Sequence, residues 1–520
     1  MSNTRVKKKS PNNRSLAARL GFGFLNGVEK VGNLLPHPFI LFVMIAAGII
    51  VASAIASLAG AEVTNPVTNE TAPVKSLASA EGLAFMLTSM LDNFLSFPPL
   101  GLVIVLLLGL GLANESGILN TALRFLVARV KHPRLITFVV ILVGILSNLA
   151  SESAAIVVPP LAALLFLSVG RHPIAGLAAG FGAVGAGFSA NVIIAGTDVL
   201  LSGISTSAAG IVNPQVSVTP VSNWYFMSAS TIVLTIVGVL VTEKIVEPRL
   251  GKYDGPSPAG SEVAAPVTAL EKRGLRNAGI AALIFLAGVA LLIIPENGIL
   301  RGEDGAVVES PFMSSIVPLL FLLFLIVGIA YGKTTGTIKT INDVPRLMIA
   351  STKDLGNLLV LIFAVAQAIA YFSWSNLGLW FAILGADALK GLNVGPIGSL
   401  LIVSVATLFF SLIISSGSAL WSLLAPVFIP MLMINGIDPA YTQLAFRIAD
   451  SSTNMLVPLS PILAVALGYI QQYNKKAGIG TVFALMIPYA VWFFLVWSVL
   501  FVVWVSVGIP IGPGETLHLG

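Results

Sequence analysis

Long apolar runs without a charged residue alternate with short charged segments along almost the whole chain. Runs such as 38–60 and 277–295 lack Asp, Glu, Lys and Arg. Each is close to the roughly 20 residues that an α-helix needs to cross a bilayer. The runs therefore predict transmembrane helices, and the charged segments between them mark the two membrane surfaces.

The Lys and Arg content of each charged segment predicts its side, because basic loops stay in the cytoplasm. The basic segments 5–19 and 124–134 are predicted to be cytoplasmic, and the acidic loops 61–82 and 296–309 to be outside. The N-terminus is then cytoplasmic and the C-terminus is outside. Nine crossings result, at 38–60, 97–113, 173–206, 222–242, 277–295, 310–332, 355–386, 439–470 and 480–508.

Two further apolar pairs, 135–170 and 397–433, are predicted to enter and leave on one side. Their tips, Ser147–Ser153 and Ser415–Ser418, are polar. Polar, non-helical backbone at membrane depth is tolerated where it lines a cavity. We therefore predict two re-entrant hairpins, although two complete crossings would also return the first pair to the inside.

The sequences at and after the two hairpin tips resemble each other weakly, which suggests an internal repeat. Ser151–Ala154 resembles Ser416–Ala419, and Ala186–Asn191 resembles Ala449–Asn454. The first hairpin is predicted to enter from inside and the second from outside, so the repeat would be inverted. Inverted repeats with broken helices are typical of secondary transporters. The predicted fold class is an all-α polytopic membrane protein with nine transmembrane helices, two re-entrant hairpins and this inverted repeat.

The same pattern divides the chain into seven segments. They are a basic cytoplasmic tail (1–37), a first transmembrane pair with its cytoplasmic connector (38–134), the first hairpin and repeat half (135–245), a Pro/Gly/Ser-rich cytoplasmic linker (246–275), the middle helices (276–396), the second hairpin and repeat half (397–510) and a C-terminal tail (511–520).

Composition narrows the function classes. Hydrophobic residues make up 56% of the chain and charged residues 10%, whereas soluble domains carry about 25% charged residues. The chain has no cysteine, and its four histidines are scattered, so we expect no thiol chemistry, no metal cluster and no enzyme activity. The basic N-terminal tail is better explained as the flank of a membrane span than as a nucleic-acid arm.

A few charges lie inside the apolar runs, where each costs at least about 2.5–3.5 kcal/mol at the bilayer centre. Arg447 and Asp450 are three residues apart on one helical face, so they can form an ion pair. Either this pair is purely structural, or Arg447 receives a substrate carboxylate. Asp198 is expected to be a cation ligand, substrate contact or proton site. Glu152 lies at the first tip, and its position is explained equally well by a functional role or by a purely structural one.

Small polar residues cluster at both hairpin tips and in the corresponding later segments. Together with backbone carbonyls freed at broken helices they could hold Na⁺, and they are Asn148, Ser189, Asn191, Ser415, Gly417, Thr453 and Asn454. Ser418 and Trp421, just past the second tip, are candidate substrate contacts, although Trp421 could equally belong to the interfacial aromatic belt. Gly180, Gly182 and Gly185 fit a dinucleotide-binding pattern, but within an apolar run they favour close helix packing.

Two motifs of the second half resemble the p-aminobenzoyl-glutamate transporter (AbgT) family: Ser415–Pro426 and Phe446–Asn454, followed by Pro458; Ala195–Asp198 matches in the first half. The resemblance implies an ion-coupled homodimer of the inner (plasma) membrane, driven by Na⁺ or H⁺, without a cofactor. It implies import of p-aminobenzoyl-glutamate or related aromatic carboxylates, or export of sulfonamide-like antimetabolites. It also assigns the substrate site to Asp198, Trp421, Arg447, Asp450 and Pro458.

Two alternatives to this function stay open. The substrate could be another small organic anion, such as a dicarboxylate. A channel is a further alternative, but channels favour rings of repeated charges or carbonyls, and this chain offers single charges in non-equivalent positions.

The topology can be tested by labelling single cysteines, since the chain has none of its own. A cysteine within 255–262 should react only with a reagent applied from inside. A cysteine within 300–306 should react only from outside. Labelling of both positions from the same side would contradict the assignment of the spans.

Overall fold

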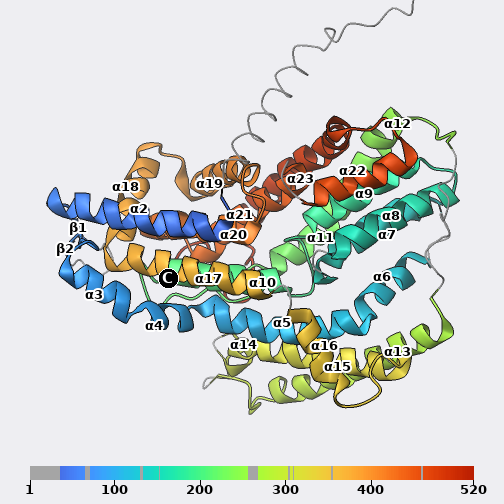
Figure 1. The fold of residues 1–520 in the computed structure, drawn as a ribbon, viewed down its shortest axis with the longest axis horizontal. Coiled ribbons are helices and arrows are strands. Elements are labelled where there is room, and N and C mark those ends of the chain that lie inside the picture. Colours follow the sequence, from blue (N-terminus) through green and yellow to red (C-terminus); the bar gives the residue numbers. More distant parts are fainter. Residues whose placement is uncertain are drawn as a thin grey trace, which may run out of the picture.

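The computed structural model describes residues 36–64, 71–128, 133–150, 153–255, 267–302, 305–308, 310–352, 355–457 and 461–519. These residues are almost entirely helical (Figure 1). Their one sheet is a small antiparallel hairpin of β1 (Glu62–Thr64) and β2 (Thr71–Pro73). The predicted all-α class is confirmed. Two predicted site residues, Glu152 and Pro458, lie outside the described residues.

Eight described helices are long and apolar enough to cross a membrane, or nine if one strongly bent pair counts as one span. The pair is α18 (Leu377–Gly391) and α19 (Gly395–Ser411), bent by 116°. The eight are α2 (Pro38–Leu58), α5 (Pro98–Ser116), α11 (Trp224–Val241, continued to Leu250 by η2 and α12), α13 (Ala269–Ile293), α15 (Ile316–Thr335), α17 (Leu355–Trp374), α20 (Gly417–Ile434) and α23 (Ile479–Val507).

Shorter helices connect these elements. They are α3 (Ala80–Thr88), α4 (Met90–Leu95), α6 (Ile118–Ala128), α14 (Pro311–Ser314) and α16 (Asp343–Ser351). In Figure 1 the β1–β2 hairpin lies at one end of the molecule and α12 (Glu247–Leu250) at the opposite end. This separation agrees with the prediction that they face opposite membrane surfaces.

The first predicted hairpin is formed by α7 (Pro133–Leu146) and α8 (Ser153–Ser168), joined through the short 3₁₀ turn η1 (Ser147–Ala150). The next predicted crossing is broken. It consists of α9 (Pro173–Ala186) and α10 (Gly196–Ala209), and residues 187–195 between them are not helical. The chain is therefore unwound just before Asp198.

The second half repeats this order of elements. Its hairpin is α19 and α20, with residues 412–416 at the tip. A broken pair follows, α21 (Pro439–Thr453) and α22 (Pro461–Tyr473), with the 3₁₀ turn η4 (Asn454–Leu456) at the start of the break. The recurrence of hairpin, helix, break and helix fits a repeat, and its inverted orientation stays a prediction.

One predicted span is wrong in detail, because the run 355–386 is two helices. α17 ends at Trp374 and α18 begins at Leu377, with Asn376 in a left-handed conformation (φ 62°) that asparagine tolerates. The Asn376 side chain donates a hydrogen bond to the carbonyl of Pro73 (3.0 Å), and the Lys75 amide donates to the carbonyl of Ser375 (3.0 Å). These bonds to the segment after β2 stabilise the turn that an apolar pattern does not reveal.

The glycine pattern in α9 serves close packing, as predicted. A Cβ at Gly180 would lie 2.7 Å from the Cα of Pro159 in α8, and one at Gly182 would lie 2.9 Å from the ring of Tyr489 in α23. Helix backbones approach this closely only through small residues. α9 is thereby fixed at the centre of the larger core cluster, next to the break that leads to Asp198.

Candidate substrate and ion site

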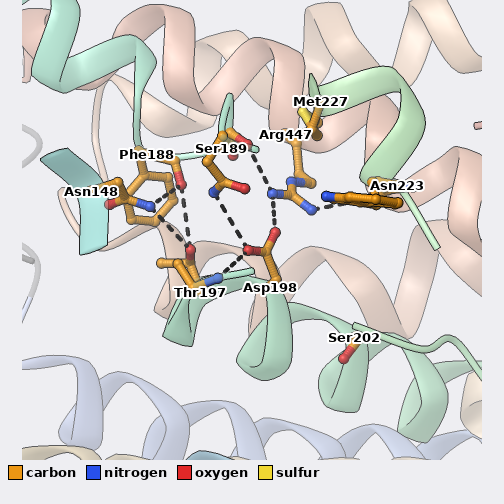
Figure 2. A network of polar contacts seen from close by, with 12 residues as sticks. Asn148, Phe188, Ser189, Thr197, Asp198, Ser202, Asn223, Met227 and Arg447 are labelled. Atoms are coloured by element: carbon orange, nitrogen blue, oxygen red, sulfur yellow. Dashed lines mark hydrogen bonds and ion pairs between the residues drawn. The ribbon is translucent and has the colours of Figure 1, made fainter. Parts of the chain in front are cut away.

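The centre of the candidate site is an ion pair between Asp198 of α10 and Arg447 of α21 (Figure 2). A guanidinium nitrogen lies 2.5 Å from a carboxylate oxygen. Both residues are buried: Arg447 is 1% exposed and Asp198 is 3% exposed. The partners are 249 residues apart in the chain. The pair therefore joins the helix after the first break to the helix before the second.

Asp198 is held in place by the break itself. It lies in the first turn of α10, and its second carboxylate oxygen accepts the Ala195 amide (2.7 Å) and the Asn191 side-chain amide (3.4 Å). A carboxylate is favoured at a helix N-terminus, where unpaired amides and the helix dipole present positive charge. Local structure and Arg447 thus stabilise the same negative charge from two sides.

Arg447 directs its guanidinium at the first half of the chain. Besides Asp198, it donates to the carbonyl of Ser189 (3.0 Å) in the break and to the side-chain oxygen of Asn223 (3.5 Å). Its Nε is buried and has no hydrogen-bond partner among the described residues. Leaving a buried charged donor unpaired is costly, so this nitrogen is able to donate a hydrogen bond to a further acceptor.

Of the two interpretations left open for Arg447 and Asp450, the ion pair between them is not formed, since Arg447 pairs with Asp198 instead. Asp450 is 1% exposed, and its Oδ2 has no hydrogen-bond partner in the described part of the chain. A Cβ at Gly417, the first residue of α20, would lie 2.6 Å from this oxygen. Asp450 therefore faces the second hairpin tip, while Arg447, one turn earlier, faces the first half.

Hydrogen bonds extend the ion pair to Trp421. Asn223 accepts from the Gln443 side chain (2.8 Å), Gln443 accepts from the Ser205 hydroxyl (2.7 Å), and Ser205 accepts from the Trp421 indole (3.0 Å). The Trp421 ring is 0% exposed and packs on Phe446, with centroids 4.5 Å apart. Trp421 thus lies in the interior rather than in an interfacial belt.

The first group of predicted ion ligands gathers beside the pair. The Asn148 amide at the first tip donates to the carbonyl of Phe188 (3.2 Å) and to Thr197 (3.5 Å). The Ser189 hydroxyl is buried and has no partner among the described residues. The structure therefore brings Asn148, Ser189 and Asn191 to one break, where hydroxyl and carbonyl oxygens are available.

The second group is less uniform. Thr453 is buried, and its hydroxyl already bonds the Ser411 hydroxyl (2.5 Å) and the carbonyl of Ala449 (2.9 Å). Asn454 is half-buried at the end of α21, and Ser415 is exposed. Gly417, the remaining predicted ligand of this group, faces the carboxylate of Asp450.

Ser418 opens onto a separate space. Together with Ser422 it borders a small, mostly apolar cavity of about 10 Å³, room for about one water molecule, between α5, α10, α17 and α20. The apolar lining is formed by Phe97, Leu200, Ile204, Leu358, Leu361, Ile362 and Val365.

The described residues contain no cluster of three or more His, Cys, Asp or Glu side chains that could hold a metal ion.

Sequence reasoning missed three uncharged members of the site, namely Asn223, Gln443 and Ser205. Each is buried and hydrogen-bonded within the network. Their one signal is a polar side chain in an apolar region, which is weaker than a charge because Ser, Asn and Gln also satisfy helix backbones locally.

The ion pair can be tested by a double-mutant cycle on purified protein. Asp198→Asn and Arg447→Gln should each cost about 3–5 kcal/mol, because each leaves one buried charge uncompensated. The double variant should lose less than the sum of the two. The matched control is Asp343→Asn, which breaks a pair whose arginine, Arg346, is 67% exposed, and this change should cost much less than either buried change. Additive losses at 198 and 447, measured by thermal unfolding in detergent, would contradict the pairing.

Comparison with known proteins now places the chain. The model described as "AbgT putative transporter family" matches residues 23–519. The p-aminobenzoyl-glutamate transport protein of Escherichia coli (strain K12) is 44% identical over 488 residues, which cover 94% of this chain and 95% of that protein.

Two solved structures have the same fold. The Alcanivorax borkumensis YdaH transporter superimposes with a TM-score of 0.87 at 40% identity, covering 92% of this chain and 100% of that one. Neisseria gonorrhoeae MtrF, described as illuminating a class of antimetabolite efflux pumps, gives 0.90 at 41% identity, covering 95% and 100%. The similarity to transporters along nearly the full length also confirms that the protein is not an enzyme. The chain belongs to the AbgT family of multi-pass membrane transporters.

Proposed function

We propose that this transporter binds p-aminobenzoyl-glutamate, or a related aromatic carboxylate, at Arg447 and couples its movement to Na⁺ or H⁺. The observation that carries the proposal is the buried Arg447, which already holds one carboxylate and has an unpaired Nε. Arginine binds a carboxylate through two parallel hydrogen bonds. A substrate carboxylate that uses Nε would therefore take the position now held by Asp198, or share it.

The aromatic end of the substrate needs apolar surroundings. The cavity beside Ser418 is bordered by apolar side chains from three further helices, with hydroxyl groups on one wall, and at about 10 Å³ it would have to widen to receive an aromatic ring. Small-molecule sites combine such apolar walls with a few polar groups that orient the ligand. The 44% identical relative is named for p-aminobenzoyl-glutamate transport, which favours an aromatic carboxylate over a plain dicarboxylate.

Charge balance gives a physical reason for ion coupling. A substrate carboxylate on Arg447 would leave Asp198 as a buried, uncompensated anion, which is strongly unfavourable. A proton on Asp198, or Na⁺ among the oxygens of Asn148, Ser189 and Phe188, would restore neutrality. Asp450, whose carboxyl oxygen is also unpaired, offers a second position for the cation. Substrate and cation would then bind together, as coupled transport requires.

The direction of transport, the location and the oligomeric state are proposed from the family resemblance rather than from the geometry of the site. A location in the inner (plasma) membrane and a homodimer are carried over from the AbgT resemblance. The similarity to MtrF supports export of sulfonamide-type antimetabolites as a second activity. The apolar side of the same site would serve it, since such compounds resemble the p-aminobenzoyl part of the substrate rather than the carboxylate end that Arg447 binds.

Flux into proteoliposomes tests the proposal. Uptake of labelled p-aminobenzoyl-glutamate should require a Na⁺ gradient or a proton gradient, imposed separately at fixed membrane potential. Arg447→Lys should weaken substrate binding about tenfold to a hundredfold, because the loss of one charge-assisted hydrogen bond costs roughly 1.5–3 kcal/mol and lysine lacks the planar fork. The matched control is Arg276→Lys on the exposed face of α13, which should transport normally. Flux that persists when both gradients are collapsed would refute coupling, and wild-type affinity in Arg447→Lys would refute the carboxylate site.

A further inference from the structure

The residues that follow α23 fold back onto the protein. We call residues 509–519 the C-terminal tail. Ile511 is 0% exposed, and its carbonyl accepts the Phe226 amide (3.1 Å). A Cβ at Gly512 would lie 2.3 Å from the carbonyl oxygen of Ser222. The first part of the tail is therefore packed tightly against the start of α11.

The second part of the tail pairs with the turn between α20 and α21. The Asp438 amide donates to the carbonyl of Leu517 (3.0 Å), and the Leu519 amide donates to the carbonyl of Gly436 (3.1 Å). Ile437 and His518 form an isolated antiparallel bridge. Backbone bonds in both directions are typical of an added strand rather than a loose end.

The two docking points lead directly into the site. Ser222 precedes Asn223, whose side-chain amide donates to the carbonyl of Ala440 (3.0 Å) and whose oxygen accepts from Arg447. The turn 436–438 begins α21, which carries Arg447. The C-terminal tail thus connects the end of the first repeat half to the start of the Arg447 helix.

Two acidic side chains meet at this connection. Asp438 caps α21 by accepting the Ala440 amide (2.7 Å), and Glu515 of the tail interacts with Ser222 and with the charge of Asp438. Tyr441 of α21 lies close enough to interact with both carboxylates, and no Lys or Arg acts on either of them among the described residues. His518 contributes its backbone to the bridge and is exposed. Asp438 and Glu515 are both half-buried. Two carboxylates brought to one such joint without a cation favour binding a proton, because each negative charge disfavours ionisation of the other.

We propose that the C-terminal tail is a proton-dependent clasp: protons on Asp438 and Glu515 favour the docked tail, and the docked tail holds Asn223 and the Arg447 helix in register. Loss of these protons places two negative charges in one half-buried joint and favours release of the tail. This role is independent of the substrate and of the coupling ion.

The direction of the pH effect follows from the two carboxyls. Burial raises the pKa of Asp438 to about 6, and burial together with the charge of Asp438 raises the pKa of Glu515 to about 7. A released tail would titrate near the ordinary values of about 3.9 and 4.3. Docking is therefore strongest in acid, weakens as pH rises from about 4 to 7, by about tenfold per pH unit for each proton lost on release, and changes little above about pH 7.

Thiol labelling measures the docking directly. Ile511→Cys places the protein's single thiol at a buried position of the tail, and Thr516→Cys places it at an exposed one. The ratio of their maleimide labelling rates in detergent cancels the intrinsic effect of pH on the thiol and reports the fraction of open tails. From pH 5.5 to 7.5 this ratio should rise by at least about tenfold.

Glu515→Gln provides the decisive variant, because glutamine keeps the shape and hydrogen bonds of the protonated acid. In that background the ratio should stay lower and keep only the weaker pH dependence that comes from Asp438, about fourfold between pH 5.5 and 7.5. A ratio independent of pH in the otherwise unchanged protein, or the full pH dependence retained in Glu515→Gln, would overturn the proposal. If Ile511→Cys does not yield folded protein, Leu517→Cys, half-buried in the same tail, gives the same readout.

Discussion

A charged arginine inside a membrane protein must always have an anion beside it, and this constraint organises the structure. Arg447 and Asp198 meet in a dry interior, where separating them would leave two charges in a medium that solvates neither. Asp198 can be there because the chain breaks before α10 and supplies amide donors. Arg447 can be there because the same break exposes the carbonyl of Ser189.

The surrounding architecture serves to hold these two breaks together. The glycines of α9 bring it against α8 and α23, which places residues 187–195 beside α21. The hydrogen-bond chain from Asn223 to Trp421 then ties α10, α20 and α21 to one another. A rearrangement of any of these helices must therefore act on the Arg447 network. If the substrate carboxylate binds as proposed, its arrival would change which helices Arg447 holds, which is the property that a transporter needs.

Much of the fold was predictable because bilayer thickness sets the length of apolar runs. The hairpin tips were visible as polar residues in positions that lipid would not tolerate. The turn at Asn376 was not, because its partners Pro73 and Lys75 are about 300 residues away in sequence and β1–β2 is too short to give a pattern.

The charged members of the site were predicted, but their connections were not. Arg447, Asp198 and Asp450 stood out as charges in apolar runs. Asp450 was one candidate partner of Arg447 and Asp198 was not considered, because a spacing of three residues is visible in sequence, whereas a contact across 249 residues is a product of tertiary packing. Uncharged members such as Gln443 carry no comparable signal, since a single amide in a helix has many local explanations.

The central claim is that Arg447 exchanges Asp198 for the substrate carboxylate, and equilibrium binding of p-aminobenzoyl-glutamate to purified Asp198→Asn tests it most directly. With the competing carboxylate removed, the variant should bind the substrate at least as tightly as the unmodified protein, and binding should raise its unfolding temperature by more, because the substrate then supplies the anion that Arg447 lacks. A loss of affinity as large as that of Arg447→Lys, in folded and monodisperse protein, would show that Asp198 is itself a substrate ligand and would contradict the exchange.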